Sequence, residues 1–307
     1  CGTITASTTL QHNVTYNGSG NQCFSIGANN TVFDCNGYWL IGPDNNSDAT
    51  NYAIHSNNIA NGTIKNCNFK GFNAVTIYLD GGTINWTVVN NNITQASINT
   101  SSATPIMIYA TGSGGTNISS NRLENYYAGS GGNNGARAIG LGNSNHNSYI
   151  MNNYIKNFTS DNAGSCFTVS AGGSQNVTAN NNEVHDITCT GATYEIGMLT
   201  MNAANSVYSN NIVNNTNIGI AIISTGVTVN NNTIYNATTS GISYGVAGVG
   251  TATNTIGTNN TFVDTINCDV IGQAINPNIS GSTYTSCTTN IKVTGSTGFQ
   301  YLDAITT

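Results

Sequence analysis

Apolar side chains recur along the chain in pairs whose members are five residues apart, and the positions between them are mostly polar. Nine copies of this pattern run through the sequence. The second apolar residues of the pairs are Tyr38, Phe69, Ile93, Leu123, Ile155, Val184, Ile212, Ile234 and Phe262. The first members are Phe33, Ile64, Val88, Ile118, Ile150, Ala179, Val207, Val229 and Gly257. Two residues before the second member stand Asn36, Cys67, Asn91, Asn121, Asn153, Asn182, Asn210, Asn232 and Asn260.

The spacing of these copies varies from 22 to 32 residues, which is too irregular for repeats of helical hairpins. Such variation is natural in a coil whose successive turns carry loops of different lengths. The pattern therefore predicts an all-β fold, a parallel β-helix of roughly ten or more coils. We expect the repeated Asn to adopt the left-handed backbone conformation at a tight bend, where its amide can bond the Asn of the next coil.

The composition agrees with a chain made of strands and bends. Asn supplies 54 of the 307 residues, and Ile occurs 32 times against 7 for Leu. Asn favours bends over helices, and the β-branched side chain of Ile favours strands. We expect a single domain over residues 1–307, with the first coil at 1–33, repeated coils at 34–264 and a C-terminal edge at 265–307.

The N-terminal segment contains four distinctive runs of residues, Cys1-Gly2-Thr3-Ile4-Thr5, Thr8-Thr9-Leu10, Ile26-Gly27-Ala28-Asn29-Asn30-Thr31-Val32 and Asp34-Cys35-Asn36-Gly37. With these runs the segment resembles a family of extracellular right-handed parallel β-helix proteins. The resemblance implies right-handed coiling and a disulfide between the first two cysteines. Members of the family are secreted enzymes, adhesins or surface structural proteins, so the resemblance implies a scaffold and no particular activity.

Eight cysteines without zinc-ligand spacing predict four disulfides formed in an oxidising compartment. One expected pair, Cys35 with Cys67, lies one residue apart in the register of adjacent coils, and the other three pairs are neighbours in sequence. The expected bridges are Cys1–Cys23, Cys35–Cys67, Cys166–Cys189 and Cys268–Cys287. The sequence leaves open whether Cys1 forms a disulfide or carries a lipid.

The charge content excludes some classes of partner. Only 6% of the residues are charged and the net charge is −6, so the basic surface of a nucleic-acid-binding protein is missing. No apolar run approaches the roughly 18 residues of a transmembrane segment, and the chain begins with Cys1 without an initiator Met. We therefore expect a processed chain that is secreted or displayed at the cell surface, with no cofactor and no metal.

One group of charged residues interrupts the polar repeats. If the second apolar residue of each pair points inward, its two neighbours point outward. Over three successive copies these outward positions hold Arg122, Glu124, Tyr154, Lys156, Glu183 and His185. Coils stack about 4.8 Å apart, so three of these side chains (Glu124, Lys156 and His185) are expected to form one column.

Two interpretations of this group are open. It could be a carbohydrate site with Glu183 or Glu124 as the acid, or an exposed ladder of ion pairs that adds little to stability. We favour the ion-pair ladder. The remaining basic candidates, His12, His55, Arg137 and His146, have no partner in the sequence. We expect Gly112–Gly115 and Tyr126–Asn147 to be loops that leave the coil.

The chain contains sixteen N-x-S/T sequons, somewhat more than composition alone would give, and we expect N-glycans on those that are exposed. We expect the bend residues Asn92, Asn231 and Asn259 to be unable to carry a glycan. The candidate sites are Asn13, Asn17, Asn29, Asn45, Asn61, Asn85, Asn92, Asn99, Asn117, Asn157, Asn176, Asn214, Asn231, Asn236, Asn259 and Asn278.

Both ends of the predicted coil lack the charges that protect strand edges. Residues 1–33 contain no Asp, Glu, Lys or Arg, and after residue 269 only Lys292 and Asp303 are charged. Unprotected edges pair with other strands, and a repeated end-to-end contact produces an open filament. The sequence therefore predicts a secreted structural subunit that polymerises head to tail. The alternatives are a carbohydrate-active enzyme, of the polysaccharide lyase or hydrolase type, and a monomeric glycan-binding adhesin.

Overall fold

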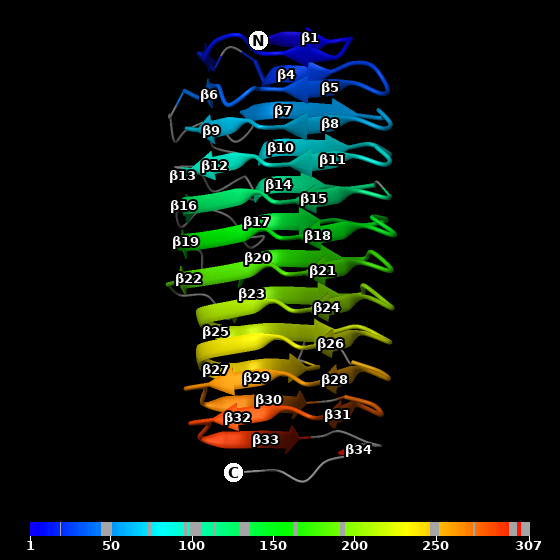
Figure 1. The fold of residues 1–307 in the computed structure, drawn as a ribbon, viewed down its shortest axis with the longest axis vertical. Coiled ribbons are helices and arrows are strands. Elements are labelled where there is room, and N and C mark those ends of the chain that lie inside the picture. The colour runs from blue at the N-terminus through cyan, green and yellow to red at the C-terminus, as the bar shows by residue number, and fades with distance from the viewer. Residues whose placement is uncertain are drawn as a thin grey trace.

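The computed structural model describes residues 1–18, 20–43, 51–72, 75–94, 97–98, 106–112, 114–128, 136–161, 165–190, 194–245, 252–272, 274–294 and 300–301. These residues form a parallel β-helix, in which each coil contributes strands to three faces and stacks on the coil before it (Figure 1). Face 2 contains twelve strands, one for each coil. The strands β1 (Gly2–Ile4) and β33 (Thr289–Thr294) lie at opposite ends of the stack.

Every strand pairs in parallel with strands of the neighbouring coils. Face 1 consists of β1 (Gly2–Ile4), β4 (Gln22–Ile26), β7 (Tyr52–Asn57), β10 (Val75–Asp80), β14 (Ile106–Ala110), β17 (Ala136–Leu141), β20 (Ser165–Gly172), β23 (Tyr194–Met201), the second halves of β25 (Ile212–Ile223) and β27 (Thr233–Tyr244), β30 (Asn267–Gly272) and β33 (Thr289–Thr294). Face 2 consists of β2 (Thr8–Thr9), β5 (Val32–Asp34), β8 (Thr63–Lys65), β11 (Thr87–Val89), β15 (Asn117–Ser119), β18 (Tyr149–Met151), β21 (Thr178–Asn180), β24 (Val207–Ser209), β26 (Thr228–Asn230), β28 (Ile256–Thr258), β31 (Asn278–Ser280) and β34 (Gln300–Tyr301). Face 3 consists of β3 (Val14–Thr15), β6 (Trp39–Ile41), β9 (Asn68–Lys70), β12 (Asn92–Thr94), β13 (Ser97–Ile98), β16 (Arg122–Ala128), β19 (Tyr154–Ser160), β22 (Glu183–Cys189), the first halves of β25 and β27, β29 (Thr261–Val263) and β32 (Thr283–Thr285).

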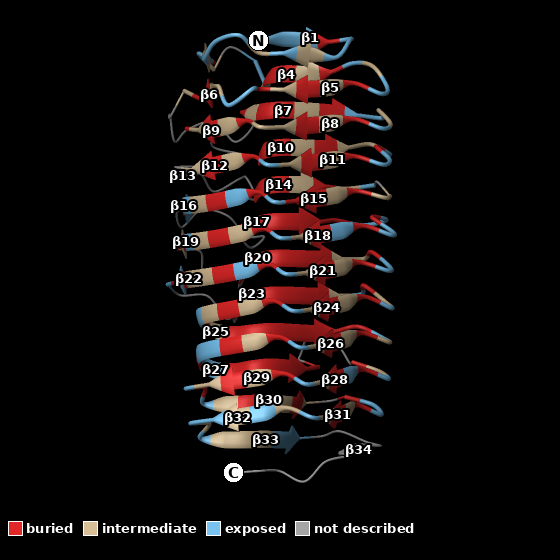
Figure 2. Ribbon diagram, in the orientation of Figure 1, coloured by how far each residue is buried: buried red, intermediate tan, exposed pale blue. Residues whose placement is uncertain are grey.

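Columns of apolar side chains fill the interior, because alternate residues of each short strand point inward and the coils stack in register. The face 2 column consists of Phe33, Ile64, Val88, Ile118, Ile150, Ala179, Tyr208, Val229, Gly257 and Ile279. Figure 2 shows these buried positions running through the stack. A Cβ atom at Gly257 would lie 2.0 Å from the hydroxyl oxygen of Tyr244, so the Tyr244 ring fills the space that this glycine leaves in the column.

The predicted register is wrong in two coils. Tyr208 and Val213 occupy the inward positions predicted for Val207 and Ile212, one residue later in each case. Both members of each neighbouring pair are apolar, so the sequence does not show which of them points inward. In the second coil Leu40 is in register with Phe69, because a turn that precedes Trp39 lengthens this coil.

Left-handed backbone conformations occur at all three corners of the coil. Asn is the non-glycine residue that adopts them most readily, because its short amide can bond locally. The second corner, between faces 2 and 3, contains Asn36, Asn66, Asn90, Ser120, Asn152, Asn181, Asn210, Asn231 and Asn259. The first corner contains Asn30, Asn61, Asn85, Asn147, Asn176, Asn205, Asn254 and Asn276, and the third contains Asn125, Asn157, Asp186, Asn215, Asn236, Asp264 and Ser286.

A separate column of buried Asn stands one residue after the second corner. It consists of Asn91, Asn121, Asn153, Asn182, Asn211, Asn232 and Asn260. The prediction that one Asn both makes the bend and forms the ladder is therefore wrong, because adjacent residues divide the two roles. This division also explains why the predicted ladder members Asn36 and Asn210 are corner residues.

Each amide in the ladder makes several hydrogen bonds. Nδ2 of Asn153 donates to Oδ1 of Asn182 in the next coil (2.9 Å) and to the carbonyl oxygen of Ile118 in the preceding coil (2.9 Å). The backbone N–H of Asn153 also donates to Oδ1 of Asn182 (3.1 Å). The ladder therefore satisfies polar groups that the corner would otherwise leave buried without partners.

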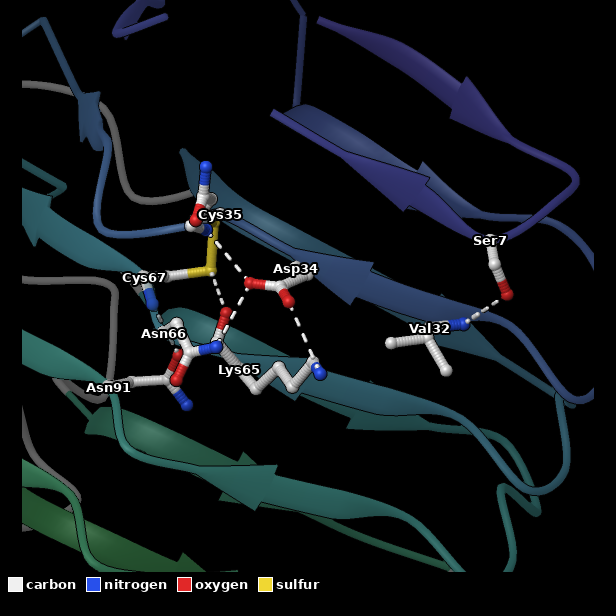
Figure 3. A network of polar contacts seen from close by, with 9 residues as sticks. Ser7, Val32, Asp34, Cys35, Lys65, Asn66, Cys67 and Asn91 are labelled. Atoms are coloured by element: carbon white, nitrogen blue, oxygen red, sulfur yellow. Dashed lines mark hydrogen bonds and ion pairs between the residues drawn. A yellow bond between two sulfur atoms is a disulfide. The ribbon is translucent and has the colours of Figure 1, made fainter. Parts of the chain in front are cut away.

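All four predicted disulfides are present, and three of them lie in coils near the ends of the stack. Figure 3 shows the Cys35–Cys67 bridge at the N-terminal end of the Asn ladder, where the backbone N–H of Cys67 donates to Oδ1 of Asn91 (3.0 Å). Four disulfides are typical of a chain that folds in an oxidising compartment. In the part of the chain that the structure describes, no helix is long and apolar enough to span a membrane.

Candidate functional site

The charged patch consists of Arg122 and Glu124 on β16, Tyr154 and Lys156 on β19, and Glu183 and His185 on β22. The predicted register is confirmed here: Arg122 aligns with Tyr154 and Glu183, and Glu124 aligns with Lys156 and His185. These side chains point outward because Leu123, Ile155 and Val184 between them are buried in the core.

Most charges of the patch are already paired. Arg122 donates two hydrogen bonds of 2.7 Å to the carboxylate of Glu124, and its guanidinium lies 4.6 Å from the ring centroid of Tyr154. Nε2 of His185 lies 3.5 Å from Glu183, and Nζ of Lys156 lies 3.8 Å from Asp186. The described ion pairs of the patch therefore lie within β16, within β22 and between Lys156 and Asp186, and none of them joins Glu124 to Lys156 along the expected column.

The two glutamates are badly placed for hydrolysis by paired acids. Glu124 and Glu183 lie two coils apart, about 9.5 Å along the axis, and in different columns. Paired carboxylates in glycoside hydrolysis lie roughly 5 to 9.5 Å apart, so the axial offset of the two backbone positions already reaches the upper end of this range and the lateral offset between their columns adds to it. A hollow of about 350 Å³ adjoins the patch and is lined by Asn152, Asn153, Tyr154, Asn181 and Glu183.

A second group lies on the outside of face 1, and we call it the Tyr–His–Arg row. It consists of Tyr52 and His55 on β7, Tyr78 on β10, Tyr109 on β14 and Arg137 on β17. His55, Tyr78 and Tyr109 share one column, and each directly follows an inward isoleucine. All five side chains are half-buried, so a ligand on this face could reach them.

The aromatic rings of the row stack from coil to coil. The ring centroids of His55 and Tyr78 lie 5.2 Å apart, and those of Tyr78 and Tyr109 lie 5.6 Å apart, with nearly parallel planes. The next residue in the column is Gly140, where a Cβ atom would lie 3.0 Å from the Tyr109 ring and 3.3 Å from Cδ of Arg137. This glycine therefore lets the Tyr109 ring and the Arg137 side chain lie against the same piece of backbone.

Burial perturbs the ionisable groups of the row. It lowers the pKa of His55, although the charge of Asp80 acts in the opposite direction. Burial also lowers the pKa of Arg137, and together with Asp80 it raises the pKa of Tyr78. Nε2 of His55 and Nε of Arg137 are buried and have no hydrogen-bond partner among the described residues. Perturbed ionisable groups with unused hydrogen-bonding atoms are typical of binding and catalytic sites.

The sequence interpretation missed this row. It treated His55 and Arg137 as isolated and assigned residues 126–147 to a loop, whereas β16 continues to residue 128 and β17 begins at residue 136. The Arg137 guanidinium lies 5.9 Å from the ring centroid of Phe167. The recurring signal was present as an aromatic or His residue directly after an Ile, at Ile54-His55, Ile77-Tyr78 and Ile108-Tyr109.

The structure also shows where His146 and the predicted glycosylation sites lie. Nδ1 of His146 accepts a hydrogen bond from the backbone N–H of Gln175 (3.1 Å). Asn231 and Asn259 are exposed corner residues and lie outside the buried ladder, contrary to the expectation that they could not carry a glycan. The exposed sequon residues in the described ranges are Asn13, Asn17, Asn29, Asn61, Asn85, Asn157, Asn176, Asn231, Asn236 and Asn259, and the half-buried ones are Asn92, Asn117, Asn214 and Asn278. Asn45 and Asn99 lie outside the described residues.

No group of three His, Cys, Asp or Glu side chains in the described residues could hold a metal ion.

Comparisons with known proteins agree on the fold. No protein-family model and no curated protein matches the chain. Among solved structures, an alginate lyase is similar at 14% identity with a TM-score of 0.63, covering 97% of this chain and 79% of that one. The A-module of a mannuronan C-5 epimerase from Azotobacter vinelandii is similar at 13% identity with a TM-score of 0.57, covering 99% and 81%. The catalytic domain of a GH87 alpha-1,3-glucanase is similar at 16% identity with a TM-score of 0.58, covering 99% of this chain and 62% of that domain.

These likenesses place the chain among parallel β-helix proteins. The names of the neighbours are those of carbohydrate-active enzymes. They therefore fit the alternative expectation of a carbohydrate-active protein better than the leading expectation of a filament subunit.

Proposed function

We propose that the chain is a secreted carbohydrate-active protein that binds a polysaccharide along the Tyr–His–Arg row. The observation that carries the proposal is the placement, on one outer face, of stacked rings beside the half-buried side chains of Arg137 and His55. Sugar hydroxyls and carboxylates accept hydrogen bonds of the kind that a guanidinium and an imidazole N–H donate. Secretion is supported by the four disulfides.

An acidic polysaccharide suits the row best. Arg137 supplies a cation with a fork of N–H groups that matches a carboxylate, and it lies close to Tyr109. The structural neighbours named for alginate and mannuronan act on polymers of this acidic kind. The ligand class that we propose is therefore a polymer of uronic acids.

Any turnover at the row would be elimination rather than hydrolysis. Hydrolysis by paired acids needs two carboxylates, and in the described part of the chain only Asp80 stands beside the row. In elimination the proton next to the sugar carboxylate is removed, a C=C bond forms and the glycosidic C–O bond breaks, with a proton passing to the leaving oxygen. Arg137 would neutralise the carboxylate, and Tyr109 is the group beside it that could transfer a proton.

The test compares two arginines on different faces. The native protein and its Arg137→Gln and Arg122→Gln variants are titrated with alginate and with a neutral glucan. Turnover is followed by the ultraviolet absorbance of the new C=C bond and by the appearance of reducing ends.

We expect Arg137→Gln to weaken alginate binding at least 10-fold and Arg122→Gln to leave it unchanged. The reverse result would move the site to the charged patch. Absence of binding by the native protein to either polymer would contradict the proposal. New reducing ends without the absorbance change would show hydrolysis and contradict the assignment to elimination.

A further inference from the structure

The two ends of the stack have complementary geometry. All strands pair in parallel, so each coil lies on the preceding one in the same orientation. The N-terminal coil of one copy can therefore lie on the C-terminal coil of another as any coil lies on the one before it. In the described residues β1 pairs only with β4, and β33 pairs only with β30, so the outer edge of β1 and that of β33 from residue 289 to 293 have no strand partner there.

Core positions are exposed at the C-terminal end. Val293 belongs to the inward column that contains Leu79, Ala110, Leu141 and Ile271, all of which are buried. Val293 is nevertheless 46% exposed, because its column ends there. An apolar side chain in an inward column that remains exposed to solvent marks a surface suited to contact with another protein.

The N-terminal coil offers matching residues. Gly2 and Ile4 stand in the same two columns as Ile291 and Val293, as the coil-by-coil register shows. A joint that continued the register would place Gly2 against Ile291 and Ile4 against Val293. It would also place Thr3 against the outward Lys292, so that no charge would be buried.

Neither end carries the charges that normally keep strand edges apart. Residues 1–33 contain no Asp, Glu, Lys or Arg. Over the described residues 274–294 the sole charge is that of Lys292, which points away from the core. Among the described residues, no pair of like-charged side chains would therefore meet across the two ends.

Disulfides hold the end coils in place. Cys1–Cys23 ties the first coil to the second, and Cys268–Cys287 ties β30 to the segment that leads into β33. A terminal coil of a solenoid has only one neighbour and is the first part to fray. Covalent bonds at both ends preserve two ordered surfaces of the kind that a stable joint requires.

We propose that the partner of each end is a second copy of this chain, joined head to tail, with β33 of one copy pairing with β1 of the next and β34 pairing with β2. At this joint the spacing between coils and both inward columns continue from one copy into the next. The contact is not self-complementary, and it continues the stacking along the axis of the coil, so it repeats in a line instead of closing a ring and produces a filament.

The test uses two variants, each of which blocks one end. Val293→Lys places a charge in the open column at the C-terminal end, and Ile4→Lys does the same at the N-terminal end. Ile84→Lys is the matched control, because Ile84 is 47% exposed but lies within the stack. The disulfide-bonded proteins are compared by electron microscopy, analytical ultracentrifugation and circular dichroism.

We expect polymers from the native protein and from Ile84→Lys, and folded monomers from each end variant. An equal mixture of the two end variants should form dimers and nothing larger, because each retains the end that the other lacks. Dimers of a single end variant would show head-to-head contact and overturn the proposal, as would a native protein that stays monomeric at every concentration.

An end variant that loses its β circular dichroism is replaced by the milder Val293→Thr or Ile4→Thr, for which a weakened rather than abolished polymer is expected. Polysaccharide binding by the Tyr–His–Arg row is measured on the same samples. Its retention by the monomers would show that assembly and ligand binding succeed or fail independently.

Discussion

Two kinds of Asn, one residue apart in sequence, have different roles at the second corner: one forms the bend and the next forms the buried ladder. Asn152 turns the corner with a φ of 56°, while the adjacent Asn153 is buried and bonds to the coils above and below. The first residue needs a tolerant backbone, and the second needs an amide that both donates and accepts. Substitutions at the two positions should therefore act through different physical causes.

The buried amide is the more sensitive of the two. We expect Asn153→Leu and Asn182→Leu each to lower the free energy of unfolding by about 1 to 3 kcal/mol, because neighbouring donors and acceptors lose their partners while remaining buried. Urea denaturation measures the change. Asn21→Leu, at an exposed position, serves as the control, and equal losses at buried and exposed positions would contradict the assigned ladder.

Asp269 is a second sensitive residue, because its carboxyl group lies inside the core between Ile242 and Ile291. Burial raises its pKa to about 7, although a hydrogen bond of 2.9 Å donated by the Tyr284 hydroxyl acts in the opposite direction. The folded chain therefore holds this proton more tightly than the unfolded chain, whose Asp pKa is about 3.9.

The sign of the pH effect follows from this difference. The contribution of Asp269 to stability is complete below about pH 4 and is lost as the pH rises through about 7. We expect Asp269→Asn to remove a pH dependence of a few kcal/mol over this range. Denaturation midpoints of both proteins at pH 4 and pH 8 measure it, and an identical pH dependence in the variant would exclude Asp269 as its source.

Among the strands, β1 lies at the N-terminal end of the stack and pairs on one side only in the described residues. The Cys1–Cys23 bridge closes a separation of 22 residues, which corresponds to about 3 kcal/mol in the chain-entropy model. We expect the double substitution Cys1→Ser with Cys23→Ser to increase amide hydrogen exchange in β1 by roughly 100-fold through local opening. Hydrogen-exchange mass spectrometry measures this.

The control for this experiment is a strand far from the missing bridge. Amides of β18, which pairs with strands on both sides, should exchange at the native rate in the same variant. Faster exchange throughout the stack would show that the bridge stabilises the molecule as a whole rather than its first coil.

How well the inward residues of a strand could be predicted from the sequence depends on how many copies of the repeat define the column to which they belong. A polar bend between two apolar residues recurs in nine successive coils, and for this reason the fold class and most inward positions were predictable. The shift to Tyr208 and Val213 was not, because adjacent apolar residues satisfy the pattern equally well. The charged patch was found because it flanks a predicted column, whereas Tyr109 and Arg137 lie on a face whose strands the repeat did not include.

At the scale of the whole molecule, the disulfide pattern was predictable and the binding surface was not. Neighbouring coils bring cysteines about one turn apart into contact, so pairing by proximity in sequence gave all four bridges. The Tyr–His–Arg row is assembled from four coils, and its burial depends on packing that no short segment of sequence encodes.

The buried ladder has a consequence for the length of the molecule. Asn211 and Asn232 occupy the same place in successive coils, 21 positions apart, and each makes the same bonds to the coil above and below. The segment from one to the next is thus an interchangeable unit, and duplicating or removing such a unit changes the height by about 4.8 Å while leaving every other contact type in place. An insertion within a coil therefore changes only the loops of that coil, whereas the length of the β-helix along its axis changes only when a whole coil is added or removed.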